Sequence, residues 1–187
     1  MRKKVIVRGP ALSRSGYGEQ TRFALRSLRA HEEKFIFLIN VGWGQTSWLA
    51  LDDEERRWID HLIHKTIVTN EQPNPRYDIS IQVTIPNEWE RIATCNIGFT
   101  AGIECSKIAP VWVEKANMMD KIIVVSNHAK FGFENTEYYA KNKQTGQVLP
   151  NYKCETPITV ANFPVREITP EVPEIELETN SNFLFVA

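Results

Sequence analysis

Residues 4–19 read Lys4-Val5-Ile6-Val7-Arg8-Gly9-Pro10-Ala11-Leu12-Ser13-Arg14-Ser15-Gly16-Tyr17-Gly18-Glu19. The apolar run within residues 4–8 predicts a β-strand, and Gly9-Pro10 is a strong turn signal that ends it. A polar loop with two more glycines follows. Apolar residues at helical spacing then predict a helix over about residues 18–30, with Arg22, Arg26 and Arg29 facing solvent. A strand, a glycine-containing loop and a helix in this order are how an α/β fold opens.

The rest of the chain repeats this rhythm. Further strands are predicted at residues 34–39, 65–69, 78–84, 96–101, 121–125 and 158–161, and further helices at 52–63, 110–119 and 127–139. A polar segment without regular structure is expected at 141–156. Strands that alternate with helices favour a parallel sheet. The predicted fold is therefore α/β, with a Rossmann-like parallel sheet of six or seven strands and helices on both faces.

The composition excludes several classes of protein. The formal net charge of −1 gives no reason to expect a nucleic-acid partner. The three cysteines form no Cys-x-x-Cys pair, which favours reduced thiols over a disulfide scaffold. No apolar run has the length of a membrane span. We expect a cytoplasmic protein, either free or peripheral to the inner face of the membrane.

The first loop is the main candidate site, because parallel α/β sheets bind ligands at the carboxyl ends of their strands. Its two glycines let the backbone approach a phosphate, and the helix that follows offers unpaired N–H groups. In the competing interpretation these glycines only permit a tight turn. The dinucleotide fingerprint is not met, because Thr21 stands where the third glycine belongs. The candidate residues of this loop are Arg14, Ser15, Gly16, Tyr17, Gly18 and Glu19.

Three later loops supply candidate cleft-lining side chains. An aromatic ring in the first could stack on a sugar, and a carboxylate there could hold hydroxyl groups. The other loops offer a carboxylate after a central strand and polar residues that could equally cap a helix. No metal site is expected, since His61 and His64 have no evident third ligand. The candidates are Asn87, Trp89 and Glu90 in the first loop, Thr100 and Glu104 in the second, and Ser126, Asn127 and His128 in the third.

Four stretches together resemble a known family. They are the strand and loop that end in Ser15-Gly16-Tyr17-Gly18-Glu19, the run Ile103-Glu104-Cys105-Ser106-Lys107-Ile108-Ala109-Pro110-Val111-Trp112-Val113, the run Met119-Asp120-Lys121-Ile122-Ile123-Val124-Val125-Ser126-Asn127-His128, and the run Ile158-Thr159-Val160-Ala161-Asn162-Phe163-Pro164-Val165. In order and spacing they are similar to the N-terminal domain of bacterial group 1 glycosyltransferases of the GT-B fold.

The resemblance implies a function. The N-terminal domain of that family binds the acceptor, and its first loop faces the diphosphate of a nucleotide-sugar donor held by a C-terminal domain. Transfer usually retains the anomeric configuration and needs no bound metal or cofactor. The acceptor would be a carbohydrate, a lipid-linked molecule or a protein.

The same resemblance divides the chain. Residues 1–165 would be the acceptor-side domain, 166–181 a linker, and 182–187 the start of a missing second domain, which would leave this fragment inactive alone. Two alternatives stay open: an NAD(P)-binding oxidoreductase domain, and a Rossmann-like binding module without catalysis.

Overall fold

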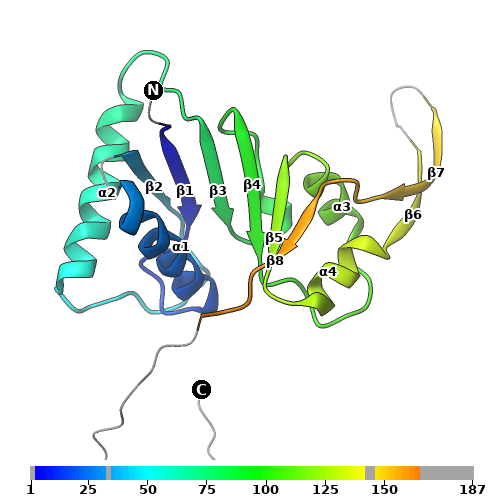
Figure 1. The fold of residues 1–187 in the computed structure, drawn as a ribbon, viewed down its shortest axis with the longest axis horizontal. Coiled ribbons are helices and arrows are strands. Elements are labelled where there is room, and N and C mark those ends of the chain that lie inside the picture. The colour runs from blue at the N-terminus through cyan, green and yellow to red at the C-terminus, as the bar shows by residue number, and fades with distance from the viewer. Residues whose placement is uncertain (1–2, 33–34, 142–145, 165–187) are drawn as a thin grey trace, which may run out of the picture.

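The computed structural model describes residues 3–32, 35–141 and 146–164, which form a six-stranded parallel sheet with flanking helices (Figure 1). The strand order is β2-β1-β3-β4-β5-β8, and every neighbouring pair is parallel. The predicted Rossmann-like α/β fold is confirmed. The strands are β1 (Val5–Gly9), β2 (Ile36–Asn40), β3 (Ile79–Val83), β4 (Cys95–Thr100), β5 (Lys121–Val124) and β8 (Ile158–Val160).

The strand order places a switch point between β1 and β3. The chain leaves β1 towards β2 on one side, and the later strands are added on the other side. The loops after β1 and β3 therefore diverge, and ligands of doubly wound sheets bind in the crevice between such loops. The first predicted loop, which follows β1, lies at this point.

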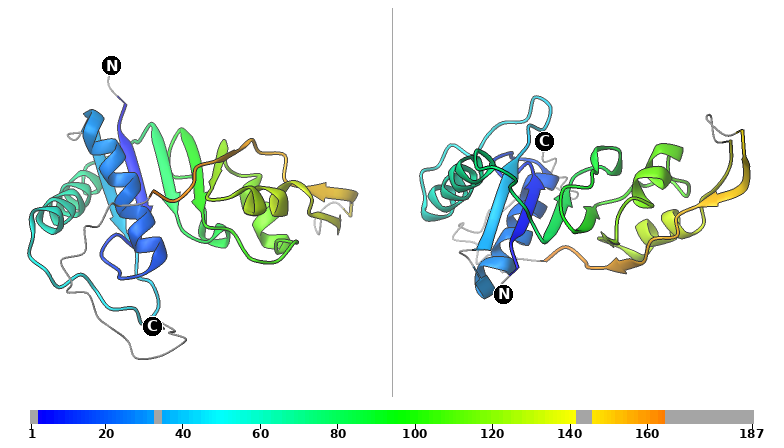
Figure 2. Two further views of the ribbon diagram at one scale, coloured as in Figure 1. Left: turned by 60° about the horizontal axis from the view of Figure 1, so that its bottom comes forward. Right: turned by 90° about the horizontal axis from the view of Figure 1, so that it is seen from above.

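The strand register separates two packed faces. Val7 pairs with Ile81, which pairs with Ile97, so these three side chains share one face. Gly98 pairs with Ile122 on the opposite face. The first face joins a core cluster with helix α1 (Gly16–Glu32), and the second joins a cluster with helices α3 (Pro110–Ala116) and α4 (Asn127–Glu134). Figure 2 shows α1 on the side opposite to α3 and α4.

Helix α2 (Glu54–Asn70) runs beside the outer edge of β2, where the Thr66 hydroxyl accepts a hydrogen bond from the Leu38 N–H at 2.8 Å. The predicted helix at 52–63 is therefore right in position but too short. The predicted strand at 65–69 is wrong, because these residues continue α2. The hydroxyls of Thr66 and Thr69 bond back to carbonyls four residues earlier, at 2.7 and 2.8 Å, so both hydroxyls find their acceptors within the helix.

The last third of the chain differs more from prediction. Helix α4 ends at Glu134, and residues 137–139 of the predicted helix belong instead to strand β6 (Glu137–Lys141). Strand β6 pairs antiparallel with β7 (Val148–Lys153), in the segment predicted to lack regular structure. The Thr136 hydroxyl bonds the Gly132 carbonyl at 2.6 Å and receives the Ile108 N–H at 3.0 Å, which fixes the exit from α4.

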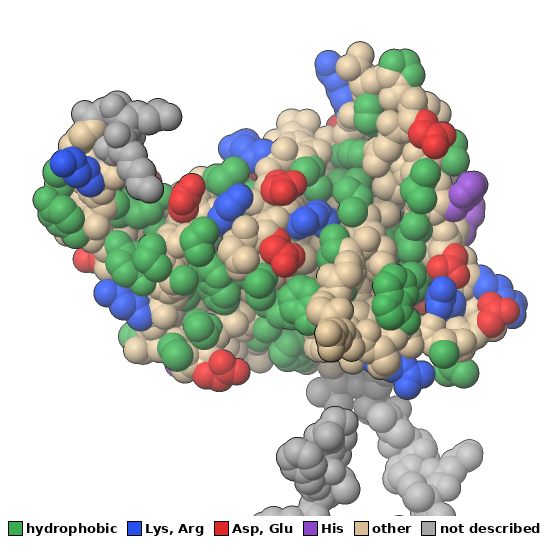
Figure 3. Space-filling view, turned by 180° about the vertical axis from the view of Figure 1, so that it is seen from behind, with side chains coloured by type: hydrophobic (Ala, Val, Ile, Leu, Met, Phe, Trp, Pro, Cys, Tyr) green, Lys and Arg blue, Asp and Glu red, His purple; other side chains and the backbone are tan. Residues whose placement is uncertain are grey.

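The β6–β7 hairpin projects from the body of the molecule (Figure 1). Seen from behind, hydrophobic side chains gather over α3, α4 and the hairpin (Figure 3). The exposed large hydrophobic residues of these elements include Val111, Phe131, Tyr139, Val148 and Leu149. Among the described residues, no helix combines the length and the apolar character that crossing a membrane requires. The predicted linker at 166–181 and the segment 182–187 lie outside the described residues.

Candidate functional site

The glycines around the first loop differ in what surrounds them. A Cβ on Gly18 would lie 2.1 Å from the Ser13 carbonyl oxygen, and a Cβ on Gly9 would lie 2.4 Å from Thr21 Oγ1. Both glycines let α1 pack tightly against β1 and its loop. Gly16 is exposed, and a Cβ there would meet nothing within 4 Å. Packing therefore does not require Gly16, which faces open space at the carboxyl edge of the sheet.

The start of α1 is fixed by a serine. The Ser15 hydroxyl accepts a hydrogen bond from the Gly18 N–H at 3.1 Å, as an N-cap side chain does. Ser13 donates to Ser15 at 3.0 Å, which ties the cap to the loop. Arg14, between these serines, has an exposed side chain. A cation beside a helix N-terminus is suited to an anionic ligand.

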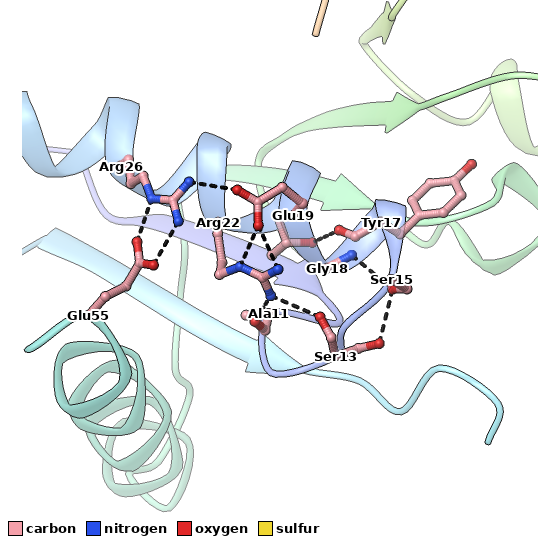
Figure 4. Close-up of polar contacts among 10 residues, drawn as sticks. Ala11, Ser13, Ser15, Tyr17, Gly18, Glu19, Arg22, Arg26 and Glu55 are labelled. Carbon is pink, nitrogen blue, oxygen red and sulfur yellow. Dashed lines mark hydrogen bonds and ion pairs between the residues drawn. The ribbon is translucent and has the colours of Figure 1, made fainter. Parts of the chain in front are cut away.

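Arg22 of α1 binds the backbone of the first loop (Figure 4). Its side chain is 6% exposed, and Nη1 donates to the carbonyls of Ala11 and Ser13 at 2.7 and 2.9 Å. Its Nε and Nη2 donate to Glu19 at 3.0 and 2.7 Å. The prediction that Arg22 faces solvent is wrong, because two loop carbonyls inside the protein need a donor.

Glu19 is the shared acceptor of two arginines. It also receives Arg26 Nη1 at 3.0 Å, and Arg26 Nη2 donates to Glu55 of α2 at 2.7 Å. Burial raises the pKa of the Glu19 carboxyl, but the hydrogen bonds and charges of Arg22 and Arg26 outweigh it, so the pKa lies below its ordinary value. Glu19 was predicted to touch a ligand, whereas its carboxylate is engaged by the scaffold that holds the loop.

Tyr17 connects the first loop to the end of β4. Its hydroxyl forms a 2.7 Å hydrogen bond with the Thr100 hydroxyl and accepts the Ala101 N–H at 3.3 Å. Burial raises the pKa of the Tyr17 phenol, and the hydrogen bonds to Thr100 and Ala101 oppose that shift only in part. Thr100 is fully buried, so its hydroxyl serves this contact rather than an open cleft surface.

A loop that carried no candidate residue runs beside the first one. The Arg14 N–H donates to the Ser47 backbone carbonyl at 2.8 Å, and the Leu49 N–H donates to the Leu12 backbone carbonyl at 2.8 Å. Residues 12–14 and 47–49 therefore lie side by side. The Trp43 ring packs on the Tyr17 ring, with centroids 4.6 Å apart and planes tilted by 38°. Trp43 is a site residue that the sequence interpretation missed, although aromatic residues after a strand could have signalled it.

The loop after β3 contains a buried tryptophan and exposed polar side chains. Trp89 is fully buried, and its ring lies where a Cβ on Gly98 would come within 2.6 Å. The prediction that Trp89 lines a cleft and stacks on a sugar is therefore wrong, because the indole covers the sheet at a position that has no side chain of its own. Gln82 Oε1 accepts the Glu90 N–H at 3.0 Å and leaves the Glu90 side chain exposed. Arg8 Nη1 donates to the Glu88 carbonyl at 2.8 Å.

The remaining candidates lie around α3 and α4. Exposed Asn87 accepts the Trp112 indole N–H at 3.3 Å. The Ser126 hydroxyl accepts the Ala129 N–H at 3.0 Å as the N-cap of α4, which confirms the helix-capping alternative. His128 Nε2 lies 3.1 Å from the Glu104 carbonyl oxygen, which joins the loops after β4 and β5. The side chains of Glu104, Asn127 and His128 are exposed at this edge.

These contacts divide the candidates into two groups. Residues 14–17 and Thr100 come together at the switch point through Tyr17, whereas the loops after β4 and β5 are joined separately through Glu104 and His128. Two concavities lie elsewhere, one of about 400 Å³ between Asn117 and β7 and one of about 380 Å³ beside Arg76 and Arg91.

Comparison with known protein families, curated proteins and solved structures finds no match to the chain.

Proposed function

We propose that this domain is the acceptor-side half of a glycosyltransferase of the GT-B fold, which transfers a sugar from a nucleotide-sugar donor to an acceptor. A second domain would hold the nucleotide, and the diphosphate would lie against the first loop. The donor is a substrate, so the proposal involves no cofactor and no metal. The acceptor would lie between the first loop and the exposed side chains of Glu104 and His128 after β4 and β5.

One observation carries the proposal, namely the open position of Gly16 at the N-terminus of α1. The helix start points its first N–H groups towards the edge of the sheet, and a Cβ at Gly16 would meet no atom within 4 Å. Exposed Arg14 adds a positive charge beside it. Backbone N–H groups and an arginine at the end of the first strand are a recurrent arrangement for phosphate groups.

The geometry favours a nucleotide sugar over a dinucleotide. In a dinucleotide-binding turn, the third glycine lies on the helix and lets the helix approach the strand. Here Thr21 holds that place, and Gly9 on the strand provides the space instead. Arg22 also fixes the backbone of the loop between Gly9 and Thr21, because its guanidinium binds the Ala11 and Ser13 carbonyls on the inner side.

Ligand titration followed by amide NMR tests the proposal. We expect UDP- or GDP-sugars to shift the amide signals of residues 14–18, with Gly16→Val reducing the affinity at least about tenfold by occupying the open space. NAD and NADP serve as competing ligands. Tighter binding of either dinucleotide at the same amides, or no shift at residues 14–18 with any nucleotide sugar, would overturn the proposal.

A further inference from the structure

Trp43 is held at the candidate site by its contact with another aromatic ring. The Tyr17 hydroxyl is anchored on Thr100 at 2.7 Å, and the Trp43 ring packs on Tyr17 with a centroid distance of 4.6 Å. Trp43 is nevertheless only half-buried. Part of the indole is therefore held by the protein, and part remains open to solvent at the carboxyl edge.

The backbone around Trp43 is also fixed. Its carbonyl accepts the Thr46 N–H at 3.2 Å and the Thr46 hydroxyl at 2.7 Å. Thr46 Oγ1 lies 2.6 Å from the hydroxyl of Ser13 in the first loop. Gly44 has a φ of 52°, a conformation that favours glycine and that closes this turn. These contacts tie the turn that carries the indole to the first loop.

A half-buried indole on a turn next to polar side chains is suited to one class of ligand. A sugar ring has an apolar face of C–H groups and a rim of hydroxyls, so it can cover an aromatic ring while its rim forms hydrogen bonds. Arg14, Ser15 and Thr46 supply polar groups next to this turn. A bare lipid chain would take the exposed Arg14 side chain out of water without offering it a partner.

We propose that Trp43 stacks on a sugar ring of the acceptor, so that the acceptor is a carbohydrate or carries one at its reactive end. This inference rests on the proposed function in one respect, because it identifies the bound sugar as part of the acceptor. The binding of a sugar ring at Trp43 can be tested separately.

The test uses the 187-residue chain and the indole N–H signals of its five tryptophans. The probes are the methyl glycosides of glucose, galactose, mannose and N-acetylglucosamine at millimolar concentration. The signal that disappears in Trp43→Phe assigns Trp43. We expect at least one glycoside to shift it, and Trp43→Ala to weaken binding of that glycoside about tenfold while Trp43→Phe retains most of it.

Trp48 provides the matched control, because it lies on the same loop and is 56% exposed. We expect Trp48→Ala to change glycoside affinity less than about twofold. Thermal melting shows whether each variant is folded, and if Trp43→Ala does not fold, the signal shift and Trp43→Phe decide. The inference is overturned if no glycoside shifts the Trp43 signal, or if Trp48→Ala weakens binding as much as Trp43→Ala.

The outcomes separate this inference from the proposed function. If nucleotide sugars shift the signals of residues 14–18 while every glycoside leaves the Trp43 signal unchanged, the transferase proposal stands and sugar stacking on Trp43 is rejected. If glycosides shift the Trp43 signal while nucleotide sugars leave the signals of residues 14–18 unchanged, the carbohydrate site at Trp43 stands and the transferase proposal is rejected.

Discussion

Gly16 and Gly18 are two residues apart and have opposite surroundings. We expect Gly18→Ala to lower the free energy of unfolding by about 2–3 kcal/mol, because the new methyl would lie 2.1 Å from the Ser13 carbonyl oxygen and the loop must move. Gly16→Ala should change it by less than about 1 kcal/mol, since nothing lies within 4 Å. Urea denaturation of both variants measures the difference. Equal losses would show that both glycines serve only the turn.

Glu19 predicts an acid-sensitive contribution to stability. Its pKa in the folded protein is below its ordinary value of 4.5, because Arg22 and Arg26 outweigh the effect of burial. A lowered folded-state pKa stabilises the protein above the unfolded-state pKa, and this stabilisation is lost as the pH falls through the folded-state value. The melting temperature of the wild type should therefore exceed that of Glu19→Gln at pH 7, with the gap closing below about pH 4.5. A gap that stays constant down to pH 3 would contradict this account.

Single residues of the site were predictable only where the loop position decides their role. The position of residues 14–17 at the end of β1 follows from a strand and a turn signal in the sequence. The inward direction of Arg22 does not, because it depends on two loop carbonyls that only the folded loop presents. The one local clue was Glu19, three residues earlier on the same helix face. The burial of Trp89 was unpredictable for a related reason, since its ring covers Gly98, a glycine nine residues later on strand β4.

Strand β4 and the loop before it pack as a complementary pair. Gly98 leaves a space that the Trp89 ring fills, and a Cβ at residue 98 would lie 2.6–2.7 Å from three atoms of that ring. We expect Gly98→Ala to lower the free energy of unfolding by about 2–3 kcal/mol, because neither the strand nor the ring has room to move. The measurement is denaturant unfolding in a double-mutant cycle with Trp89→Leu.

The cycle gives a clear criterion. The two changes should compensate in part, with a coupling of at least about 1 kcal/mol, because a smaller side chain at residue 89 makes room for the added methyl. Additive losses would mean that the ring and the strand do not limit each other.

The secondary-structure elements were predictable where one periodicity was unbroken. The central strands alternate or run apolar between turn signals, and they were found within one or two residues. The C-terminal part of α2 was mistaken for a strand, because Ile67, Val68 and the threonines around them favour strands by local propensity. Packing of Leu62 and Thr66 against β2 overrides that preference. The β6–β7 hairpin gave a weak signal, since its strands are largely exposed.

The whole molecule should open unevenly. Strands β1 and β3 each have a neighbouring strand on both sides, and their residues Val7 and Val83 are fully buried, whereas most residues of β7 are exposed. Hydrogen exchange measured by mass spectrometry should therefore be slowest in peptides that cover β1 and β3, and fastest among the strands in β6 and β7. Protection of the hairpin equal to that of β1 would indicate that it is covered by another molecule in solution.

The parallel sheet also separates the two directions in which the molecule can be attached to a surface. Strand β1 begins at the edge opposite the candidate site, and β8 runs parallel to it and ends at the same edge as the site (Figure 1). An affinity tag ahead of Lys3 would anchor a biosensor layer from the far edge and leave the Trp43 turn open to flowing analyte. A linker joined at Pro164 would emerge beside the site. Attachment to the sensor through that linker would therefore block access of the analyte to the Trp43 turn.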